Sequence, residues 1–365
     1  MHNTSITTIS VHLDNRSYPI DVGTGLINNL PTYLNDHKVG KKVFLITDQT
    51  IAPLYGHHLE SILSAQSYVV TLIIIPSGEA QKSFKNAGDL LDRILELRPE
   101  RNDSVVALGG GVIGDLAGFI ASLCLRGINL FQLPTSLLGQ VDACIGGKTA
   151  VNHSTGKNLI GCFYQPKLTL IDLNCLNTLP IHELKCGMAE IVKYGVIKNT
   201  SLFNYIEQNI DKISEFDPKK YPVIWRHLIV SSAMDKAEVV SNDEREAGLR
   251  ETLNFGHTIG HAIESAYTYG TFSHGEAVAL GMIASCKISV TLNIMTPQVS
   301  DRIKTLLTKL GFGTTIPALP LDQFLTPMSS DKKVKNGKIR FILASEIGKT
   351  ETRNDVPEEL VKSAI

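Results

Sequence analysis

The first half of the chain alternates apolar, β-branched runs with segments of helical spacing, and this alternation constrains the fold most. The apolar runs lie at residues 43–47, 69–75, 104–110, 128–134 and 168–173. Helical spacing and length separate the first three runs, over residues 51–66 and 84–98. Strands that alternate with helices predict βαβ units and therefore a mostly parallel sheet.

The periodicity changes after about residue 180. Later stretches with helical spacing include LKCGMAEIVKYGVI, WRHLIVSSAMDKAEVVS, ETLNFGHTIGHAIES and HGEAVALGMIASCKISVTL, while KNGKIRFILAS at 335–345 indicates a strand or short hairpin. A chain of 365 residues suits two domains, since single cores stop growing at roughly 250–300 residues. We predict an α/β protein with a Rossmann-like, mostly parallel N-terminal domain over residues 1–180 and a mainly α-helical C-terminal domain over residues 181–365.

Charge and cysteine usage exclude several classes of protein. The formal net charge of -1 gives no bulk attraction to nucleic acid or to an anionic membrane. The six cysteines are scattered without a CxxC pair, which is typical of reduced thiols in a cytoplasmic protein. The N-terminus lacks the pattern of a signal peptide, and the apolar run near Tyr68 is too short to span a bilayer. We therefore expect a cytoplasmic protein.

A glycine-rich segment, LGGGVIGDLAGF, contains the pattern Gly109-x-Gly111-x-x-Gly114 between a predicted strand and a predicted helix. A dinucleotide pyrophosphate binds in this context, at the helix N-terminus. No acidic residue ends the next strand to hold a ribose, but Asp48 ends an earlier one. The uncharged residues after Asp48 favour NAD over NADP. A tight turn that merely needs small residues is an equal alternative.

Three histidines and one glutamate form a candidate metal site. His257 and His261 lie one helical turn apart, so both rings leave the same face, and His274 follows in FSHGEAVALGM. Glu190 lies in an otherwise apolar helical stretch. A catalytic zinc takes three protein ligands, and two imidazoles with one carboxylate suit Zn²⁺ or a similar ion. His261 would then be available for proton transfer. From spacing alone, a core or solvated histidine pair is the more common outcome.

A third signal is a set of cationic and amide side chains in stretches rich in small residues. They are Arg126, Lys148, Lys157, Asn158, Lys236, Arg250, Asn254, Lys332 and Lys333. A single lysine is normally solvated, but Lys148 and Lys157 follow glycines, in loops that would let an anion approach closely. A helix through LRETLNFGH would also turn Arg250, Asn254 and His257 toward one face. Together with a nucleotide and a metal, the set predicts a small, polyanionic, hydroxylated substrate.

These motifs occur in one order that resembles the 3-dehydroquinate synthase family. The matching stretches run from about residue 48 to residue 341 and include GEAQKS, GGGVIGDLAGF, RGI, LPTSLLGQVDACIGGKTAVNH, GKNLIG, GMAEIVKYG, KAEVVSNDEREAGLRETLNFGHTIGHAIE, HGEAVALGM and DKK. The resemblance implies a cytoplasmic homodimer that binds NAD and Zn²⁺ (or Co²⁺) between an α/β domain and a helical domain. It also implies conversion of 3-deoxy-D-arabino-heptulosonate 7-phosphate into 3-dehydroquinate and phosphate.

The resemblance assigns roles residue by residue. The implied metal ligands are Glu190, His257 and His274. The implied catalytic residues are His261 for proton transfer and phosphate contact, Glu246 as a proton acceptor, Lys193 and Lys148. The implied NAD contacts are Asp48, Glu79, Lys82, Gly110, Gly111, Val112, Asp115, Thr135, Ser136, Lys157 and Thr178. The implied substrate contacts are Arg126, Asp142, Lys148, Asn158, Lys193, Lys236, Arg250, Asn254 and Lys332, which is favoured over Lys333. Arg126 is expected to serve the neighbouring subunit's site.

The implied reaction uses NAD and regenerates it within each turnover. NAD⁺ oxidises the C5 alcohol, which acidifies the C6 proton, and phosphate then leaves by elimination. The hydride returns, and the released enol pyranose opens and closes by an intramolecular aldol step. Two enzymatic alternatives remain: a sibling sugar phosphate cyclase whose substrate lacks the carboxylate, and a metal- and NAD-dependent polyol dehydrogenase of the glycerol dehydrogenase type. A non-enzymatic binding module leaves the Glu190, His257 and His274 set unexplained.

Overall fold

The computed structural model describes residues 6–267, 271–316, 334–335 and 338–365. The chain divides into two compact units, one of Met1–Leu179 with Lys236–Ser241 and one of Pro180–Asp235 with Asn242–Ile365. The predicted division at residue 180 assigned residues 236–241 to the second domain, whereas this segment groups with the first unit. Below, the first is called the α/β unit and the second the helical unit.

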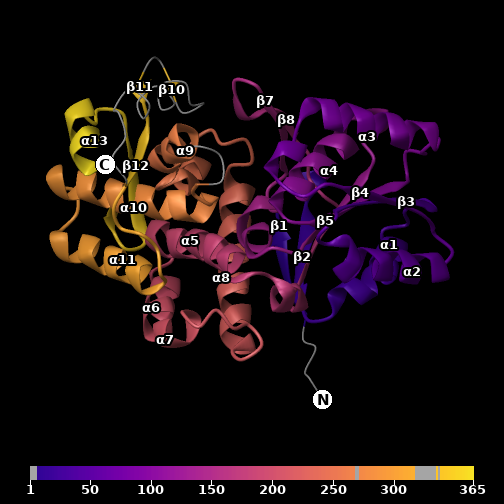
Figure 1. The fold of residues 1–365 in the computed structure, drawn as a ribbon, viewed down its shortest axis with the longest axis horizontal. Coiled ribbons are helices and arrows are strands. Elements are labelled where there is room, and N and C mark those ends of the chain that lie inside the picture. The colour runs from indigo at the N-terminus through magenta and orange to yellow at the C-terminus, as the bar shows by residue number, and fades with distance from the viewer. Residues whose placement is uncertain (1–5, 268–270, 317–333, 336–337) are drawn as a thin grey trace. The chain divides into compact units, whose positions relative to one another are not determined.

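A seven-stranded sheet in the order β1-β2-β9-β6-β5-β3-β4 forms the α/β unit (Figure 1). Its strands are β1 (Thr7–Val11), β2 (Tyr18–Gly23), β3 (Lys42–Asp48), β4 (Val69–Ile75), β5 (Ser104–Gly109), β6 (Asn129–Pro134) and β9 (Leu168–Asp172). All neighbours pair in parallel except β1 and β2. The predicted mostly parallel α/β fold is confirmed, while the N-terminal pair β1–β2 was not predicted.

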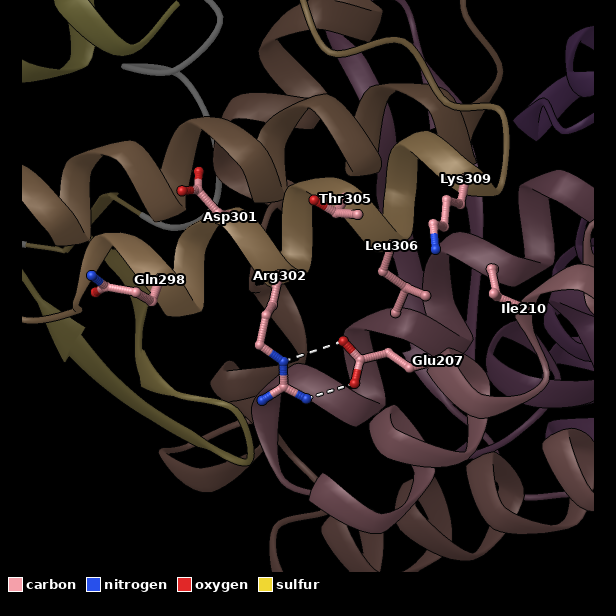
Figure 2. A pocket seen from close by; sticks show the side chains of 8 residues that line it. All are labelled: Glu207, Ile210, Gln298, Asp301, Arg302, Thr305, Leu306 and Lys309. Atoms are coloured by element: carbon pink, nitrogen blue, oxygen red, sulfur yellow. Dashed lines mark hydrogen bonds and ion pairs between the residues drawn. The ribbon is translucent and has the colours of Figure 1, made fainter.

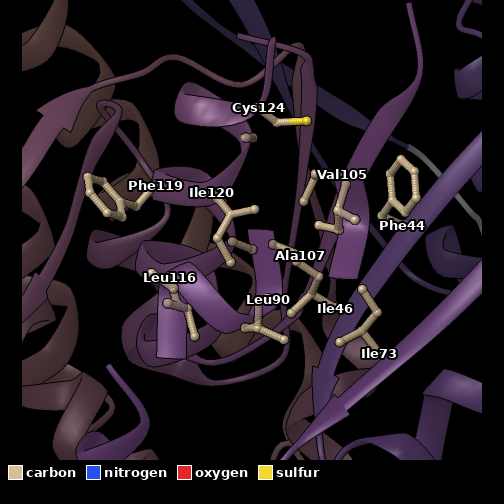
Figure 3. Packing of buried hydrophobic residues seen from close by; sticks show 14 of the residues in the cluster. Phe44, Ile46, Ile73, Leu90, Val105, Ala107, Leu116, Phe119, Ile120 and Cys124 are labelled. Atoms are coloured by element: carbon tan, nitrogen blue, oxygen red, sulfur yellow. The ribbon is translucent and has the colours of Figure 1, made fainter. Parts of the chain in front are cut away.

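Helices cover both faces of this sheet because its central strands are apolar on both sides. The main helices are α1 (Leu30–Asp36), α2 (His57–Ala65), α3 (Phe84–Glu96) and α4 (Gly111–Leu123). Phe44 and Ile46 point to the core shared with α3 and α4 (Figure 3), whereas Val43 and Leu45 point to the core shared with α1 and α2. This alternation explains why the strands appear in the sequence as continuous apolar runs.

Short elements complete the α/β unit. They are η1 (Asp14–Arg16), η2 (Leu26–Asn29), η3 (Ala52–Gly56), η4 (Glu79–Gln81), η5 (Cys124–Arg126), η6 (Gly139–Ala143), η7 (Leu173–Thr178), and the hairpin of β7 (Lys148–His153) and β8 (Gly156–Phe163). The prediction that Lys148 and Lys157 lie in loops was wrong, since both lie in this hairpin. It forms because the alternate β7 residues Thr149 and Val151 are buried.

The helical unit contains α5 (Ile181–Ile197), α6 (Thr200–Gln208), α7 (Ile210–Ile213), most of α8 (Pro222–Asn242), η8 (Leu249–Asn254), α9 (His257–Ala266), α10 (His274–Thr291), α11 (Pro297–Lys309) and α13 (Glu358–Ala364). Small antiparallel pairs join β10 (Val334–Lys335) to β11 (Lys338–Ile339) and β12 (Phe341–Glu346) to β13 (Lys349–Arg353). The core packs α9 and α10 against β12 and α13 through side chains such as Ile263, Leu280 and Leu343. Within the described residues, no helix has the length and apolar character needed to cross a membrane.

Candidate active site

Three side chains from three helices of the helical unit converge on one point. Glu190 lies in α5, and His257 and His274 are the first residues of α9 and α10. Glu190 Oε1 lies 3.3 Å from Nε2 of His257 and 3.3 Å from Nε2 of His274. Donor atoms bound at about 2.0–2.1 Å to one tetrahedral Zn²⁺ are roughly 3.3 Å apart, so this spacing fits a single ion. The three residues are called the ligand cluster below.

The other ring nitrogens are held by acceptors that orient the ligand cluster. His257 Nδ1 lies 3.1 Å from the carbonyl oxygen of Phe255, and His274 Nδ1 lies 3.2 Å from Glu264 Oε2. An imidazole that donates through Nδ1 presents its Nε2 lone pair, and metal-binding histidines are usually held in this way. Sequence reasoning missed Glu264, although it lies within HAIES, seven residues after His257.

Buried charges around the ligand cluster set its protonation. Lys193 forms an ion pair with Glu190 Oε2, and the two side chains are 1% and 0% exposed. Burial raises the pKa of Glu190, but Lys193 and His257 together hold that pKa well below its ordinary value. Burial lowers the pKa of His257 to about 4 despite the nearby carboxylate of Glu190. For His274, burial is outweighed by hydrogen bonds to Glu190 and Glu264, which raise its pKa to about 10.

His261 lies beside the ligand cluster. Its ring centroid is 5.4 Å from that of His257 and 6.2 Å from that of His274. One donor atom each of His261, Glu264 and His274 also lie within 4.8 Å of one another. An imidazole in this place is close enough to exchange a proton with a molecule held at the cluster.

A loop organised by Asp243 carries further predicted residues. The Asp243 carboxylate accepts backbone N–H groups of Ala247 at 2.8 Å, Gly248 at 2.8 Å and Arg250 at 3.0 Å. Burial raises the pKa of Asp243, but these N–H groups outweigh it and lower that pKa. Within the loop, Glu246 takes a left-handed φ of 60°. Sequence reasoning missed Asp243, whose signal was an aspartate opening the turn NDEREAG.

Arg250 and Asn254 follow this loop in η8. The Arg250 side chain is fully buried, and its Nη1 donates to the carbonyl oxygen of Glu244 at 2.5 Å. Asn254 Nδ2 donates to Glu246 Oε1 at 2.8 Å, which joins a predicted substrate residue to the predicted proton acceptor. The prediction of one helix from Arg250 to His257 was wrong, because η8 ends at Asn254 and Gly256, with a φ of 77°, separates it from α9.

In the α/β unit, many predicted NAD contacts lie along one edge of the sheet. β3 ends at Asp48, β5 ends at Gly109, and Thr135 and Ser136 follow β6. Because these strands are parallel, their carboxyl ends meet at this edge, where α/β proteins bind nucleotides. Gly110 caps α4, which begins with Gly111 and Val112, and Asp115 follows in the next turn.

Close packing at this edge requires glycine at two positions of the pattern. A Cβ at Gly109 would lie 2.6 Å from Ile113 Cγ1, and one at Gly114 would lie 2.8 Å from Cys144 Sγ. The strand-to-helix turn is therefore tight, with α4 beginning two residues after β5 ends. Such a turn suits a pyrophosphate. Asp48 Oδ1 meanwhile accepts N–H groups of Thr50 at 2.8 Å and Ile51 at 3.1 Å, which fixes the end of β3.

The buried Lys82 forms an ion pair with Asp115 beside the glycine turn. Lys82 is 5% exposed, and its Nζ lies 2.5 Å from Asp115 Oδ2 and 3.8 Å from Glu79 Oε1. Burial lowers the pKa of Lys82, but Asp115 and Glu79 outweigh it and hold that pKa above its ordinary value. Asn152, which sequence reasoning missed, donates to Glu79 at 2.8 Å and accepts the N–H of Asn158 at 2.9 Å.

Of the remaining predicted residues, some contact one another and others do not. Lys236 donates to Asp142 Oδ1 at 2.6 Å, and Lys236 is buried. Thr178 shares a hydrogen bond of 2.6 Å with Tyr55 and is exposed at the end of η7. Arg126 is exposed in η5 and has a left-handed φ of 67°. Lys332 and Lys333 lie outside the described residues.

A surface cavity of about 400 Å³ lies elsewhere in the helical unit, between α11 and residues of α6 and α7 (Figure 2). It is lined by Glu207, Ile210, Gln298, Asp301, Arg302, Thr305, Leu306 and Lys309. Arg302 and Glu207 face each other there in a paired contact, with Nη2 to Oε2 at 2.6 Å and Nε to Oε1 at 3.2 Å. None of these residues belongs to the predicted site.

Known proteins similar to this chain include a curated 3-dehydroquinate synthase of Rippkaea orientalis, 45% identical over 98% of this chain and 97% of its own length. A crystal structure of 2-deoxy-scyllo-inosose synthase, complexed with carbaglucose-6-phosphate, NAD⁺ and Co²⁺, is 28% identical and covers 98% of both chains with a TM-score of 0.87. The 2-epi-5-epi-valiolone synthase of Streptomyces hygroscopicus, with NAD⁺ and Zn²⁺ bound, is 28% identical, covers 95% of both chains and has a TM-score of 0.86.

The family comparison covers most of the chain. The family model of the 3-dehydroquinate synthase N-terminal region matches residues 72–186, and the model of its C-terminal region matches residues 187–334. The second match contains the whole ligand cluster, and the first contains the glycine turn. The chain therefore belongs to the 3-dehydroquinate synthase family.

Proposed function

We propose that this enzyme is a lyase that converts 3-deoxy-D-arabino-heptulosonate 7-phosphate into 3-dehydroquinate and phosphate. The observation that carries the proposal is the convergence of Glu190 Oε1 with the Nε2 atoms of His257 and His274 at 3.3 Å, with both Nδ1 atoms held by acceptors. Such an arrangement suits a catalytic metal with an open position. The similarity to curated 3-dehydroquinate synthases supports the choice of substrate.

Two cofactors belong to the proposal, a divalent ion on the ligand cluster and NAD at the edge formed by Asp48, the glycine turn and Thr135. The similar synthases bound to NAD⁺ with Co²⁺ or Zn²⁺ support both. When bound, the ion would polarise a substrate hydroxyl and NAD⁺ would supply reversible hydride transfer. The protein's own residues would position the ion, NAD and the substrate relative to one another.

Acidic and basic side chains beside the ligand cluster would handle protons. His261 has the role of taking a proton from the substrate and contacting its phosphate, because its ring lies 5.4 Å from that of His257. Glu246 is a second proton acceptor, and Asn254 fixes one of its oxygens through a hydrogen bond of 2.8 Å. Lys193 balances the charge of Glu190 by its ion pair with Oε2, so that Oε1 remains directed at the two histidines.

The substrate's two anionic ends need cations. The guanidinium of Arg250, buried and held by the carbonyl of Glu244, is preorganised to pair with the carboxylate. Lys236, held by Asp142, is the second cation for that end. Lys148, Lys157 and Asn158 of the β7–β8 hairpin are further contacts to the substrate and cofactor.

The requirement for a carboxylate on the substrate distinguishes this function from that of a sibling cyclase. A site built with buried donors rejects an analogue that lacks the acceptor, since its cations are then left unpaired. We expect turnover of the heptulosonate phosphate and none of sedoheptulose 7-phosphate, which has no carboxylate. Replacement Arg250→Ala should cost about 2–5 kcal/mol in transition-state binding.

The test is kcat/KM for both substrates on the intact enzyme and on Arg250→Ala, with product analysis and supplied NAD⁺ and Zn²⁺. Comparable turnover of sedoheptulose 7-phosphate by the intact enzyme would move the chain to the sibling cyclases. Net NADH release, followed by absorbance, would instead indicate the polyol dehydrogenase. Formation of 3-dehydroquinate without net NADH is the expected result.

A homodimer in the cytoplasm is the proposed form. Arg126 is exposed and held at a φ of 67°, and strained backbone of this kind often occurs at functional positions. If Arg126 serves the neighbouring subunit, Arg126→Ala and Lys148→Ala chains should restore activity when mixed, because some sites then have both side chains. Mixtures that exchange subunits and stay inactive would place Arg126 in its own subunit's site. The six free cysteines support a reducing compartment.

A further inference from the structure

The two helices that begin with the histidine ligands touch through backbone atoms. α9 begins at His257 and α10 begins at His274. A Cβ at Gly281 of α10 would overlap the carbonyl oxygen of Gly256 and lie 2.8 Å from the amide nitrogen of Gly260. Real Cβ atoms essentially never approach other atoms within 3.0 Å. No side chain therefore fits at residue 281 unless α9 and α10 move apart.

The contact is also close, though less tight, from the side of α9. A Cβ at Gly260 would lie 3.0 Å from the carbonyl oxygen of Ala277. A Cβ at Gly256 would lie 2.9 Å from the carbonyl oxygen of Val278, and its φ of 77° is one that glycine adopts readily. Gly256 immediately precedes His257, so the contact lies directly beside a ligand.

A fourth glycine ties α10 to α5, which bears the third ligand. A Cβ at Gly275 would lie 2.5 Å from both Cα and the carbonyl oxygen of Cys186. The Gly275 N–H also donates to Cys186 Sγ at 3.3 Å. Gly275 follows His274, and Cys186 lies one turn before Glu190 on α5. The Cys186 thiol is therefore a packing and hydrogen-bonding partner of α10.

We propose that Gly256, Gly260, Gly275 and Gly281 are positioning residues that set the spacing of the three ligand atoms. This inference rests on the metal site proposed above and explains how its geometry is reached. Ligand bonds tolerate only about 0.2 Å of error, and packed backbone cannot be compressed to absorb a methyl group. The glycines let the helices approach until the Nε2 and Oε1 atoms lie 3.3 Å apart.

Glycine contacts also occur where they only pack helices, and one provides a matched control. A Cβ at Gly195 of α5 would lie 3.0 Å from Cβ and 3.1 Å from Cα of Phe203 in α6, a helix without a ligand. A second control is Gly88 in α3, where a Cβ meets nothing within 4 Å. Alanine is the better helix former, so Gly88→Ala should raise the Tm or leave it unchanged.

The experiment compares Gly260→Ala, Gly275→Ala and Gly281→Ala with Gly195→Ala and Gly88→Ala. The Zn²⁺ dissociation constant is measured by competition with a chromophoric chelator, and the coordination geometry is read from the visible spectrum of the Co²⁺ form. We expect Zn²⁺ binding to weaken roughly 10- to 100-fold in Gly260→Ala, Gly275→Ala and Gly281→Ala, whose contacts join two ligand-bearing helices, with an altered Co²⁺ spectrum. Gly195→Ala should lower the Tm while keeping the wild-type Zn²⁺ affinity and Co²⁺ spectrum.

Gly260→Ala introduces the mildest overlap of the three, and it decides the question even where Gly281→Ala fails to fold. Wild-type Zn²⁺ affinity and Co²⁺ spectrum in folded Gly260→Ala and Gly275→Ala would overturn the inference while leaving the metal site intact. An equal loss of affinity in Gly195→Ala would also overturn it, because any helix disturbance would then suffice. If the wild-type protein binds neither ion, the proposed metal site itself fails.

Discussion

Each unit contains a cluster of charges around a buried lysine, and the position of that lysine distinguishes the two clusters. In the helical unit, Lys193 pairs with Glu190 Oε2, away from the Oε1 atom that faces the two histidines. In the α/β unit, the ammonium of Lys82 lies between Asp115 at 2.5 Å and Glu79 at 3.8 Å. The first cluster directs three ligand atoms at one point, while the second already has a cation at its centre.

The comparison shows how two charge clusters can suit ligands of opposite charge. Three converging acceptor atoms suit a metal ion, which brings the positive charge itself. The partial positive charge at the N-terminus of α4 suits an anion such as a pyrophosphate, and Lys82 offsets part of the negative charge of Asp115 and Glu79 beside it. The following changes test this difference, from the largest expected effect to the smallest.

Removal of a ligand should have the largest effect. We expect His257→Ala, His274→Ala and Glu190→Ala to lose bound metal and turnover while they remain folded. His261→Ala should keep the metal and lose roughly 10²- to 10⁴-fold in kcat, since it acts on protons. Elemental analysis and kcat measure both effects. Full metal content in His274→Ala would remove that residue from the ligand cluster.

The second effect concerns the cation of the α/β unit. Lys82→Met leaves the partly buried Asp115 carboxylate, which is 19% exposed, without its cation, so the free energy of unfolding should fall by about 1–3 kcal/mol. The double variant with Asp115→Asn should recover part of this loss. NAD⁺ affinity should fall in both variants, whereas Zn²⁺ content should not change. Denaturant unfolding and nucleotide titration provide the data, and a loss of Zn²⁺ would show that the two clusters are not independent.

A third change removes the anchor of the Glu246 loop. Asp243→Ala leaves three backbone N–H groups without their carboxylate, and two of them are exposed to water, so we expect the free energy of unfolding to fall by about 1 kcal/mol. The rate should fall as well, because Glu246 and Arg250 lose their fixed places. Asp243→Asn keeps an acceptor and should restore part of kcat. An unchanged kcat in Asp243→Ala would show that the loop needs no anchor for catalysis.

The smallest effect compares two helix caps. Ser273 caps α10 directly before His274, and Ser83 caps α3 in the α/β unit. Replacement of either serine by alanine should lower the free energy of unfolding by about 1 kcal/mol. Only Ser273→Ala should also weaken Zn²⁺ binding, by a factor well below that of ligand removal. Equal Zn²⁺ affinity in the two variants would show that capping of α10 does not reach the metal.

Sequence reasoning succeeded where the physical signal was local. The strands from β3 to β9 that lie in the sheet's parallel part were predicted because burial on both faces demands continuous β-branched runs. The polar hairpin β7–β8 and the charged strand β13, KTETR, carry no such run and were not predicted. The break at Gly256 was missed because the helical pattern on either side continues across it.

The candidate site was predicted mainly through family resemblance. Spacing alone left the histidines undecided, since Glu190 and His274 lie 84 residues apart in sequence. Supporting residues such as Glu264, Asn152 and Asp243 act through hydrogen bonds to groups fixed only by the fold, so a single sequence offers little to identify them. The close contacts of Gly256, Gly260, Gly275 and Gly281 could not be predicted either, because they depend on how the helices pack in the fold.

Helix α8 has a consequence for the order in which the two units can fold during synthesis. It runs from Pro222 to Asn242, yet its stretch Lys236–Ser241 groups with the α/β unit. There Lys236 pairs with Asp142, and Ser241 Oγ accepts the N–H of His12 at 2.8 Å. During synthesis, the N-terminal unit is therefore incomplete until the ribosome has passed residue 241. A fragment ending at residue 180 should consequently need a separate α8 peptide to reach its final form.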